Sequence, residues 1–181
     1  MEKIKEIMKK VYDHQMDGII FHFQMIDMYD FLHLKGFKKW QECMLKEEME
    51  ATADTQHHFI KRHHALLTPY QKVYENNIIP MSWYEQSSMD VSKEDIIKET
   101  KRSLHEYLKW EKETLEMLMH VSKELIEHEA YNEYMDIREM SDHVAGEIHY
   151  IECLMIELES VGYDAVYIQK LQNRFCVEFD D

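Results

Sequence analysis

Residues 36–64 read GFKKWQECMLKEEMEATADTQHHFIKRHH, and the interpretation of the whole chain starts from them. The stretch contains no proline and no glycine beyond Gly36. A single helix of about eight turns can therefore begin just after Gly36 and end near Ala65.

Acidic residues interrupt the apolar face of this predicted helix. The apolar stripe of this helix consists of Trp40, Met44, Ala51 and Thr55. Glu47 and Glu48 fall where this stripe should continue, and Asp54 and His58 lie near its far end. Carboxylates that face a helical core are costly unless a partner neutralises them, and a bound cation is the usual partner. The pattern predicts a metal site. The alternative is a solvated helix, rotated so that its acids face water.

Length, composition and charge narrow the class of protein. The chain has 181 residues, of which 45% are hydrophobic and 12% aromatic, and these values predict one folded domain, residues 1–181, rather than a disordered chain. The formal net charge of −15 argues against nucleic acid and anionic membranes as partners, because phosphate groups attract Lys and Arg. An excess of acidic residues favours cations as binding partners instead.

The predicted location is the cytoplasm. The sequence contains no run of about 18 apolar residues, so we expect no membrane-spanning helix, and it contains no leader with a small-residue cleavage site. Cys43, Cys153 and Cys176 are odd in number and widely spaced. Such cysteines are typical of free thiols in a reducing compartment.

Four glycines and two prolines punctuate the chain and predict its helices. Both prolines fall within residues 66–91, which have no helical period and are unusually long for a connection. A link of this length joins two parallel helices across the full length of a bundle. Ser92 opens the next helix with SKED, a pattern that resembles a capping box. The predicted helices are about 2–33, 37–65, 92–124, 130–160 and 164–175.

The other long helices also carry a polar residue within an apolar stripe. The first has His22 among Ile4, Met8, Val11, Gln15, Ile19 and Ile26; the third has Glu111 among Leu104, Leu108, Leu115 and Leu118; the fourth has Glu147 among Met140, Val144, Ile151, Leu154 and Leu158. Acids in the core register of three helices support one another. They predict an all-α bundle with a buried metal site.

Four short motifs, in this order and spacing, resemble those of the ferritins. They are DHQM at residues 13–16, HLKGFKKW at 33–40 with EE seven residues later, LKWE at 108–111, and SDHVAGE at 141–147. The resemblance covers almost the whole chain, including the long connection and a short last helix. It implies a ferritin-like four-helix bundle with a long second-to-third helix crossover and a short fifth C-terminal helix.

The resemblance also implies a di-iron centre within the bundle. Ferritins oxidise iron there with Glu and His ligands, and such hard donors suit Fe(II) and Fe(III). By this alignment Glu48 corresponds to the bridging Glu of the second helix, Glu111 to the Glu of the third, and Glu147 to an acid of the fourth.

The match to the ferritin ligand set is partial. Ala51 stands where the second-helix His is expected, and Ile19 stands where the first-helix Glu is expected, unless a two-residue gap aligns Asp17. The fourth-helix Gln corresponds to Val144 or, with a shift of one residue, to His143. Two of the usual ligands are therefore replaced.

Substitute ligands occur in helical register. Asp54 is spaced for chelation with either His57 or His58, and Glu139, His143 and Glu147 follow one another at steps of four. The predicted altered site contains His22, Glu48, Asp54, His58, Glu111, His143 and Glu147, with no catalytic residue separate from these ligands. Each of them also has a structural interpretation, because a His near an apolar face is commonly a hydrogen-bonded core residue.

The predicted function is iron storage or detoxification. The resemblance implies that iron is bound and oxidised from Fe(II) to Fe(III) inside the bundle, with dioxygen or peroxide as the oxidant, and deposited on an acidic inner surface. It also implies a homo-oligomeric cage, with the 24 subunits of the family as the expected size. Two alternatives remain: a structural cage or interaction protein that has lost this chemistry, and a small di-metal enzyme of the same superfamily.

Overall fold

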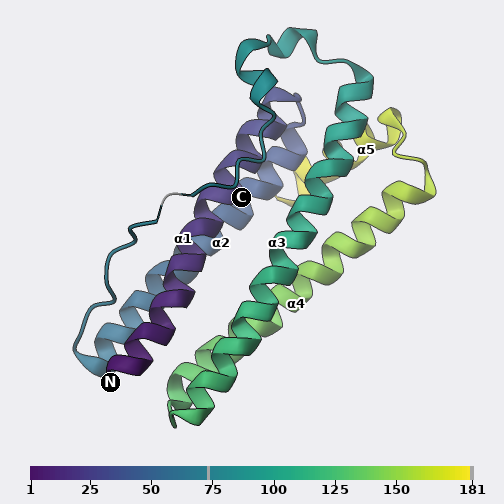
Figure 1. Cartoon of the computed structure of the whole chain (residues 1–181). Coiled ribbons are helices and arrows are strands. Elements are labelled where there is room, and N and C mark those ends of the chain that lie inside the picture. Colours follow the sequence, from purple (N-terminus) through teal and green to yellow (C-terminus); the bar gives the residue numbers. More distant parts are fainter. Residues whose placement is uncertain (73, 180–181) are drawn as a thin grey trace.

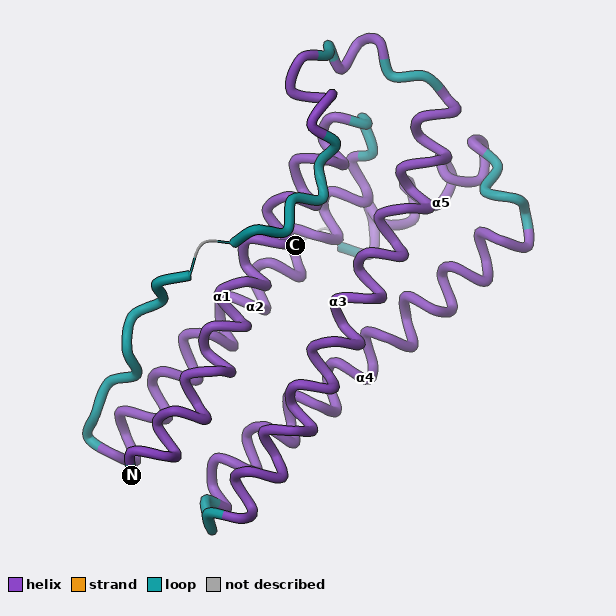
Figure 2. Tube along the Cα trace, viewed as in Figure 1, coloured by secondary structure: helices purple, strands orange, loops and turns teal. Residues whose placement is uncertain are grey.

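The computed structural model describes residues 1–72 and 74–179. All regular elements among these residues are helical: α1 (Glu2–Phe31), α2 (Lys35–His63), α3 (Lys93–Glu127), α4 (Tyr131–Ser160) and α5 (Ala165–Glu178), with two short 3-10 helices at Met81–Glu85 and Ser88–Asp90 (Figure 2). Residue 73 of the predicted crossover and residues 180–181 of the predicted domain lie outside the described residues.

The helices form two antiparallel pairs, α1 with α2 and α3 with α4 (Figure 1). The long connection runs back along the bundle, so α2 and α3 point in the same direction. The short α5 packs against α2 and α3 at one end. The prediction of an all-α bundle with a long second crossover and a short fifth helix is confirmed.

Local sequence signals explain several of the helix boundaries. The predicted capping box at the start of α3 is confirmed: Ser92 Oγ accepts a hydrogen bond from Asp95 N at 3.1 Å, and Asp95 Oδ2 accepts one from Ser92 N at 3.0 Å. His64 ends α2 in the left-handed conformation, with φ of 52°. The third helix continues to Glu127, beyond the predicted residue 124, because no glycine or proline interrupts it.

Two apolar clusters form the core, and the acidic centre lies between them. One cluster, near α5, contains Phe37, Trp40, Tyr107 and Phe175, all nearly or fully buried. The other, at the opposite end, contains Ile7, Val11, Phe59, Leu118 and Ile137. Glu48 of α2, Glu111 of α3 and Glu147 of α4 lie between the residues of the two clusters, whereas His22 of α1 lies beside Phe21 and Tyr107 of the cluster near α5.

The predicted stripe of the first helix is confirmed at Met8, Val11, Gln15 and His22, which are buried, and is wrong at Ile19 and Ile26. Ile19 and Ile26 are only half-buried, whereas Gly18, Phe21 and Met25 are buried on α1. The cause is that a glycine contributes no apolar surface to the pattern, although it permits the closest approach of a neighbouring side chain.

Hydrogen bonds fasten the crossover to α1 and α3. Tyr70 donates to Asp17 at 2.6 Å, Ile78 N donates to the Gln24 side chain at 2.7 Å, and Arg102 donates to the Ile78 carbonyl at 2.6 Å. Asp17 therefore faces the crossover and not the bundle interior.

A polar clamp joins the two helix pairs at the end remote from α5. Arg62 of α2 donates from both terminal guanidinium nitrogens to the Asp136 carboxylate of α4, and His63 Nε2 lies 2.9 Å from Glu133 Oε1. Lys10 of α1 pairs with Glu124 of α3 at 3.0 Å. The pairs are thus connected at both ends, by this clamp and by the aromatic cluster near α5.

None of the helices in the described part of the chain combines the length and the apolar character needed to cross a bilayer.

Candidate metal centre

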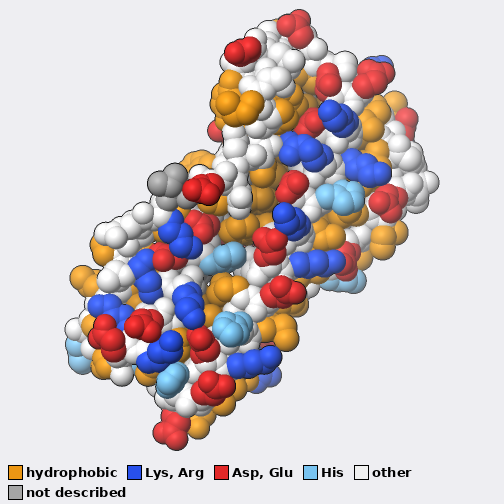
Figure 3. Space-filling model, viewed as in Figure 1, with side chains coloured by type: hydrophobic (Ala, Val, Ile, Leu, Met, Phe, Trp, Pro, Cys, Tyr) orange, Lys and Arg blue, Asp and Glu red, His pale blue; other side chains and the backbone are white. Residues whose placement is uncertain are grey.

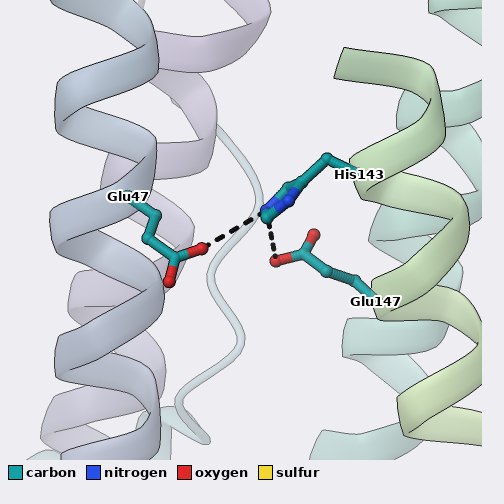
Figure 4. Close-up of side chains that lie close together, drawn as sticks. All are labelled: Glu47, His143 and Glu147. Carbon is teal, nitrogen blue, oxygen red and sulfur yellow. Dashed lines mark ion pairs between the residues drawn. The ribbon is translucent and has the colours of Figure 1, made fainter. Parts of the chain in front are cut away.

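A cleft of about 520 Å³ opens between the two helix pairs at the middle of the bundle. All four long helices contribute to its walls, and the carboxyl groups of Glu48, Glu111 and Glu147 lie along it. Figure 3 shows the α1–α3 face of the bundle, on which acidic and basic side chains are interspersed, whereas the residues at the mouth of the cleft come from α2 and α4 on the other face (Figure 4).

Three side chains at the mouth of this cleft form a compact donor set. Glu47 projects from α2, and His143 and Glu147 project from successive turns of α4 toward it (Figure 4). His143 Nε2 lies 3.3 Å from Glu47 Oε2 and 3.5 Å from Glu147 Oε1, and one donor atom from each residue lies within 4.8 Å of the other two. Two carboxylates and one imidazole at these separations can hold a single divalent cation. We refer to Glu47, His143 and Glu147 as the mouth triad.

Two more carboxyl groups, from Glu48 and Glu111, lie next to Glu147. Glu111 is only 3% exposed, and burial together with the charges of Glu147 and Glu48 raises its pKa well above the usual range. Burial is also the main reason why the pKa of Glu48 rises to about 8, and the charge of Glu147 adds to it. No lysine or arginine among the described residues forms an ion pair with these three acids. A bound cation would supply the missing positive charge.

His143 is held in its protonated form by the neighbouring acids. A hydrogen bond to Glu147 is the largest cause, and the charges of Glu147 and Glu47 add to it, raising the pKa of His143 to about 9. A metal that binds the ring must therefore displace a proton at neutral pH.

The first helix brings no carboxylate to the centre. Gly18, and neither Ile19 nor Asp17, faces Glu48: a Cβ at position 18 would lie 3.0 Å from Glu48 Oε1. Ile19 lies in a separate surface groove with Tyr12 and Met49. Placing the first-helix ligand position at Ile19 or Asp17 was thus incorrect, because the close packing of the Glu48 side chain selects a residue without a side chain.

His22 is the polar residue of α1 that lies deepest. It is 3% exposed, its Nδ1 lies 2.9 Å from Gln41 Oε1, and burial lowers its pKa. Because Gln41 Oε1 can only accept, Nδ1 carries the proton and Nε2 keeps its lone pair. His22 lines the same cleft as Glu111 and Glu147, so a neutral imidazole lies beside the centre.

The remaining predicted ligands lie farther along the cleft. Asp54 and His58 follow Glu48 by roughly 9 and 15 Å along the helix axis. His58 Nδ1 lies 3.4 Å from Asp136, which Arg62 already neutralises. Of the predicted set, the structure brings together Glu48, Glu111, Glu147 and His143, places His22 beside them, and leaves Asp54 and His58 outside this cluster.

Glu47 was not among the predicted ligands. The sequence contained a signal for it, since Glu47 and Glu48 both interrupt the apolar stripe of α2. Neighbouring residues on a helix point about 100° apart, so both can serve one centre only where the bundle is open. The Glu47 side chain is 44% exposed at the mouth of the cleft.

An up-and-down helix pair, a long crossover, a second pair and a short terminal helix, with carboxylates at mid-bundle, together define the ferritin fold. No protein-family model matches the sequence, and no curated protein sequence matches it. Among solved structures, an open pore ferritin from the hyperthermophilic archaeon Archaeoglobus fulgidus aligns with a TM-score of 0.77 at 12% identity, over 97% of this chain and 96% of that chain. The apo-ferritin of Pseudo-nitzschia multiseries aligns with a TM-score of 0.72 at 13% identity, over 95% and 98%. The resemblance to a ferritin fold is confirmed by these structures.

Proposed function

We propose that this chain binds Fe(II) as its substrate at the mid-bundle centre, oxidises it to Fe(III), and stores the product as a subunit of a hollow homo-oligomeric cage. The observation that carries the proposal is the convergence of Glu48, Glu111 and Glu147 from three helices, with no lysine or arginine partner among the residues that the structure describes. Structural ion-pair networks balance their own charges, as Arg62 does for Asp136, whereas in the described part of this centre one protonated imidazole, His143, faces four acids.

The donor set supports iron as the metal. Carboxylate oxygens and imidazole nitrogen suit Fe(II), and additional carboxylates favour the more highly charged Fe(III) once it forms. Each Fe(II) gives one electron to dioxygen or peroxide. Glu147 belongs to the mouth triad and also lies beside the buried acids Glu48 and Glu111. It is therefore the residue best placed to be shared by two metal ions.

The rest of the molecule is consistent with storage. The chain carries 36 acidic against 21 basic residues, so an assembled shell would attract Fe(II) and offer carboxylates for mineral growth. The solved structures with a similar fold are ferritins, and one of them was solved after soaking in iron.

A matched pair of variants tests the proposal. We expect anaerobic Fe(II) titration followed by oxygen to give rapid oxidation, seen as near-ultraviolet absorbance, with a small whole number of irons per chain. Glu48→Gln should abolish the fast phase, whereas Glu42→Gln, an exposed acid on the same helix, should leave it intact. Sedimentation of the protein should show a large assembly. Oxidation no faster than in buffer alone would rule out the oxidation step.

A second candidate function is an inert cage or interaction protein with the same fold. Gly18 and Ala51 favour it, because two positions that line the centre provide no ligand atom. The iron content of the protein after expression in iron-rich medium distinguishes the two. A functional store fills, and an inert shell stays nearly empty.

A further inference from the structure

A second cavity, of about 480 Å³, adjoins the mouth triad on the side toward α5. One part of its wall is apolar and mainly aromatic, and consists of Trp40, Met44, Tyr107, Tyr150, Ile151 and Phe179. The other part is acidic and consists of Glu47, Asp142, Glu147 and Glu178, with His143 among them. The volume is within the range of small-molecule sites.

The absence of a side chain at Gly146 keeps this cavity open. Gly146 lies in the interior of α4 and lines the cavity, although glycine is unfavourable within a helix. A Cβ at this position would meet nothing within 4 Å, whereas a Cβ at Gly36 would lie 2.0 Å from the Gln172 carbonyl oxygen. Close packing therefore explains Gly36 and does not explain Gly146.

Negative charge is in excess along the acidic part of the wall. One protonated imidazole, that of His143, lies between two of the four acids. Of the other two, Glu178 lies 4.0 Å from Arg174, and Asp142 forms no ion pair among the described residues. The described lining includes no lysine or arginine. The wall therefore favours a cation as the ligand and disfavours an anion.

The aromatic part of the wall favours an organic cation. Hydrocarbon can pack against the rings of Trp40 and Tyr150, and aromatic faces also attract an ammonium group. The Tyr107 side chain lines the cavity and is fully buried, and its hydroxyl has no hydrogen-bond partner among the described residues. Its oxygen can accept a hydrogen bond. A primary ammonium has three N–H donors for such an oxygen and for carboxylates, whereas a quaternary ammonium has none.

We propose that this cavity binds a primary amine with an apolar chain, in its protonated form. The ammonium group donates hydrogen bonds to the carboxylates and to the Tyr107 hydroxyl, and the apolar chain packs along the aromatic part of the wall. Binding is non-covalent and requires no metal. The inference is therefore independent of the proposed function, and it gives the chain an organic-ligand site beside the mid-bundle centre.

Calorimetry with the metal-free protein tests this site. Hexylammonium is titrated into EDTA-treated protein and compared with 1-hexanol and hexanoate, which carry a chain of the same length with a neutral and an anionic head. We expect hexylammonium to bind at least about tenfold more tightly than hexanol, and hexanoate to show no binding, because the head group meets carboxylates. Ethylammonium should bind at least about tenfold more weakly than hexylammonium, because it lacks four methylene groups that the aromatic wall would bury.

Three variants locate the bound amine. Gly146→Leu should fill part of the cavity and weaken hexylammonium binding at least about tenfold. Ala145→Leu is the matched control and should bind as the parent protein does, because Ala145 is exposed on the same helix and does not line the cavity. Tyr107→Phe removes only the hydroxyl group and should weaken hexylammonium binding by about three- to tenfold.

Several results would overturn the inference. Equal affinity for hexylammonium and hexanol would mean that the acids do not recognise the ammonium group, and equal affinity for hexylammonium and ethylammonium would mean that the amine binds surface charge alone. Binding to Gly146→Leu or to Tyr107→Phe as tight as to the parent protein would place the amine elsewhere. Absence of hexylammonium binding to the parent protein overturns this inference and leaves the proposed function standing, because Fe(II) oxidation is measured separately.

Discussion

The Glu48 carboxyl group is buried beside the acids Glu147 and Glu111, and the charge of His143 offsets them only in part. Its pKa of about 8 in the fold, against an ordinary value of 4.5, means that the folded chain holds a proton that the unfolded chain has released at neutral pH. A raised folded pKa stabilises the protein fully below pH 4.5, and this contribution is lost as the pH rises through 8. The side chain favours metal binding at the expense of stability.

We therefore predict opposite effects of Glu48→Gln on stability and on metal affinity. The amide removes the buried charge, so the variant should be more stable than the parent by roughly 1–3 kcal/mol at pH 8.5, and equally stable near pH 4. Its metal affinity should fall by at least about tenfold. Urea denaturation at both pH values checks the first effect and Zn²⁺ calorimetry the second, with Glu42→Gln as the unaffected control. A destabilised Glu48→Gln at pH 8.5 would reveal a cationic partner for the carboxylate.

Metal binding should also release protons. At pH 7 both His143, with a pKa of about 9, and Glu48, with a pKa of about 8, carry protons that a metal must displace. We expect Zn²⁺ affinity to rise with pH from 6 to 9, with roughly one to two protons released per chain at pH 7. Calorimetry in buffers of different ionisation enthalpy measures this number. In His143→Gln the number should fall, and an affinity independent of pH would contradict the assignment of these ligands.

Gly36 allows α2 to lie very close to the backbone of α5 at Gln172. A Cβ at Gly36 would lie 2.0 Å from the Gln172 carbonyl oxygen, which belongs to the backbone and has no flexible end to move away. Only a shift of the whole of α5 can relieve such a contact. The aromatic cluster around Phe175 would lose packing at the same time.

Gly36→Ala should therefore destabilise the fold by about 1–3 kcal/mol. Gly146→Ala should act in the opposite direction and stabilise by roughly 0.5–1 kcal/mol, because alanine is the better helix former and nothing opposes its methyl group. Thermal and urea unfolding of the two variants provide the comparison. A neutral Gly36→Ala would mean that α5 is not packed against α2 in solution.

The helices could be predicted from the sequence because their boundaries depend on local chemistry. The capping box at Ser92 acts within one turn, and the crossover was recognisable by its prolines and its lack of a helical period. The inward position of Gly18 on α1 could not be predicted in this way. Gly18 faces Glu48 because of a contact between helices, and a hydrophobic pattern assigns no face to a residue without a side chain.

The site was predictable in part for the same reason. Glu111 and Glu147 each stand alone in an apolar stripe, so periodicity points them inward. Glu47 joins the centre because the cleft between α2 and α4 is open, which is a property of the assembled bundle. Asp54 and His58 have suitable spacing for chelation, but His58 lies against Asp136 of α4, which is distant in the sequence and is itself paired with Arg62.

At the scale of the whole molecule, the two helix pairs are connected at both ends and separated in the middle. The aromatic cluster closes the end near α5, and the Arg62–Asp136 clamp with Lys10–Glu124 closes the other. Between them, α2 and α4 meet across the cleft through the mouth triad, which includes a protonated imidazole between two acids. A cation that binds Glu47 from one pair and Glu147 from the other would cross-link the pairs at their weakest point.

Metal binding should therefore slow hydrogen exchange in the central turns of α2 and α4, about residues 44–51 and 140–150, and leave the ends of these helices unchanged. Opening of this region separates the pairs without breaking either closed end, so its free energy lies below that of global unfolding and rises with the metal's binding energy. Exchange measured by mass spectrometry with and without Zn²⁺ at pH 8 tests this. Glu47→Gln should remove the protection, because it cuts the only ligand that α2 gives to the triad, whereas Glu42→Gln should retain it. Equal protection along the full length of both helices would indicate that the metal stabilises the bundle globally and that the pairs do not open separately.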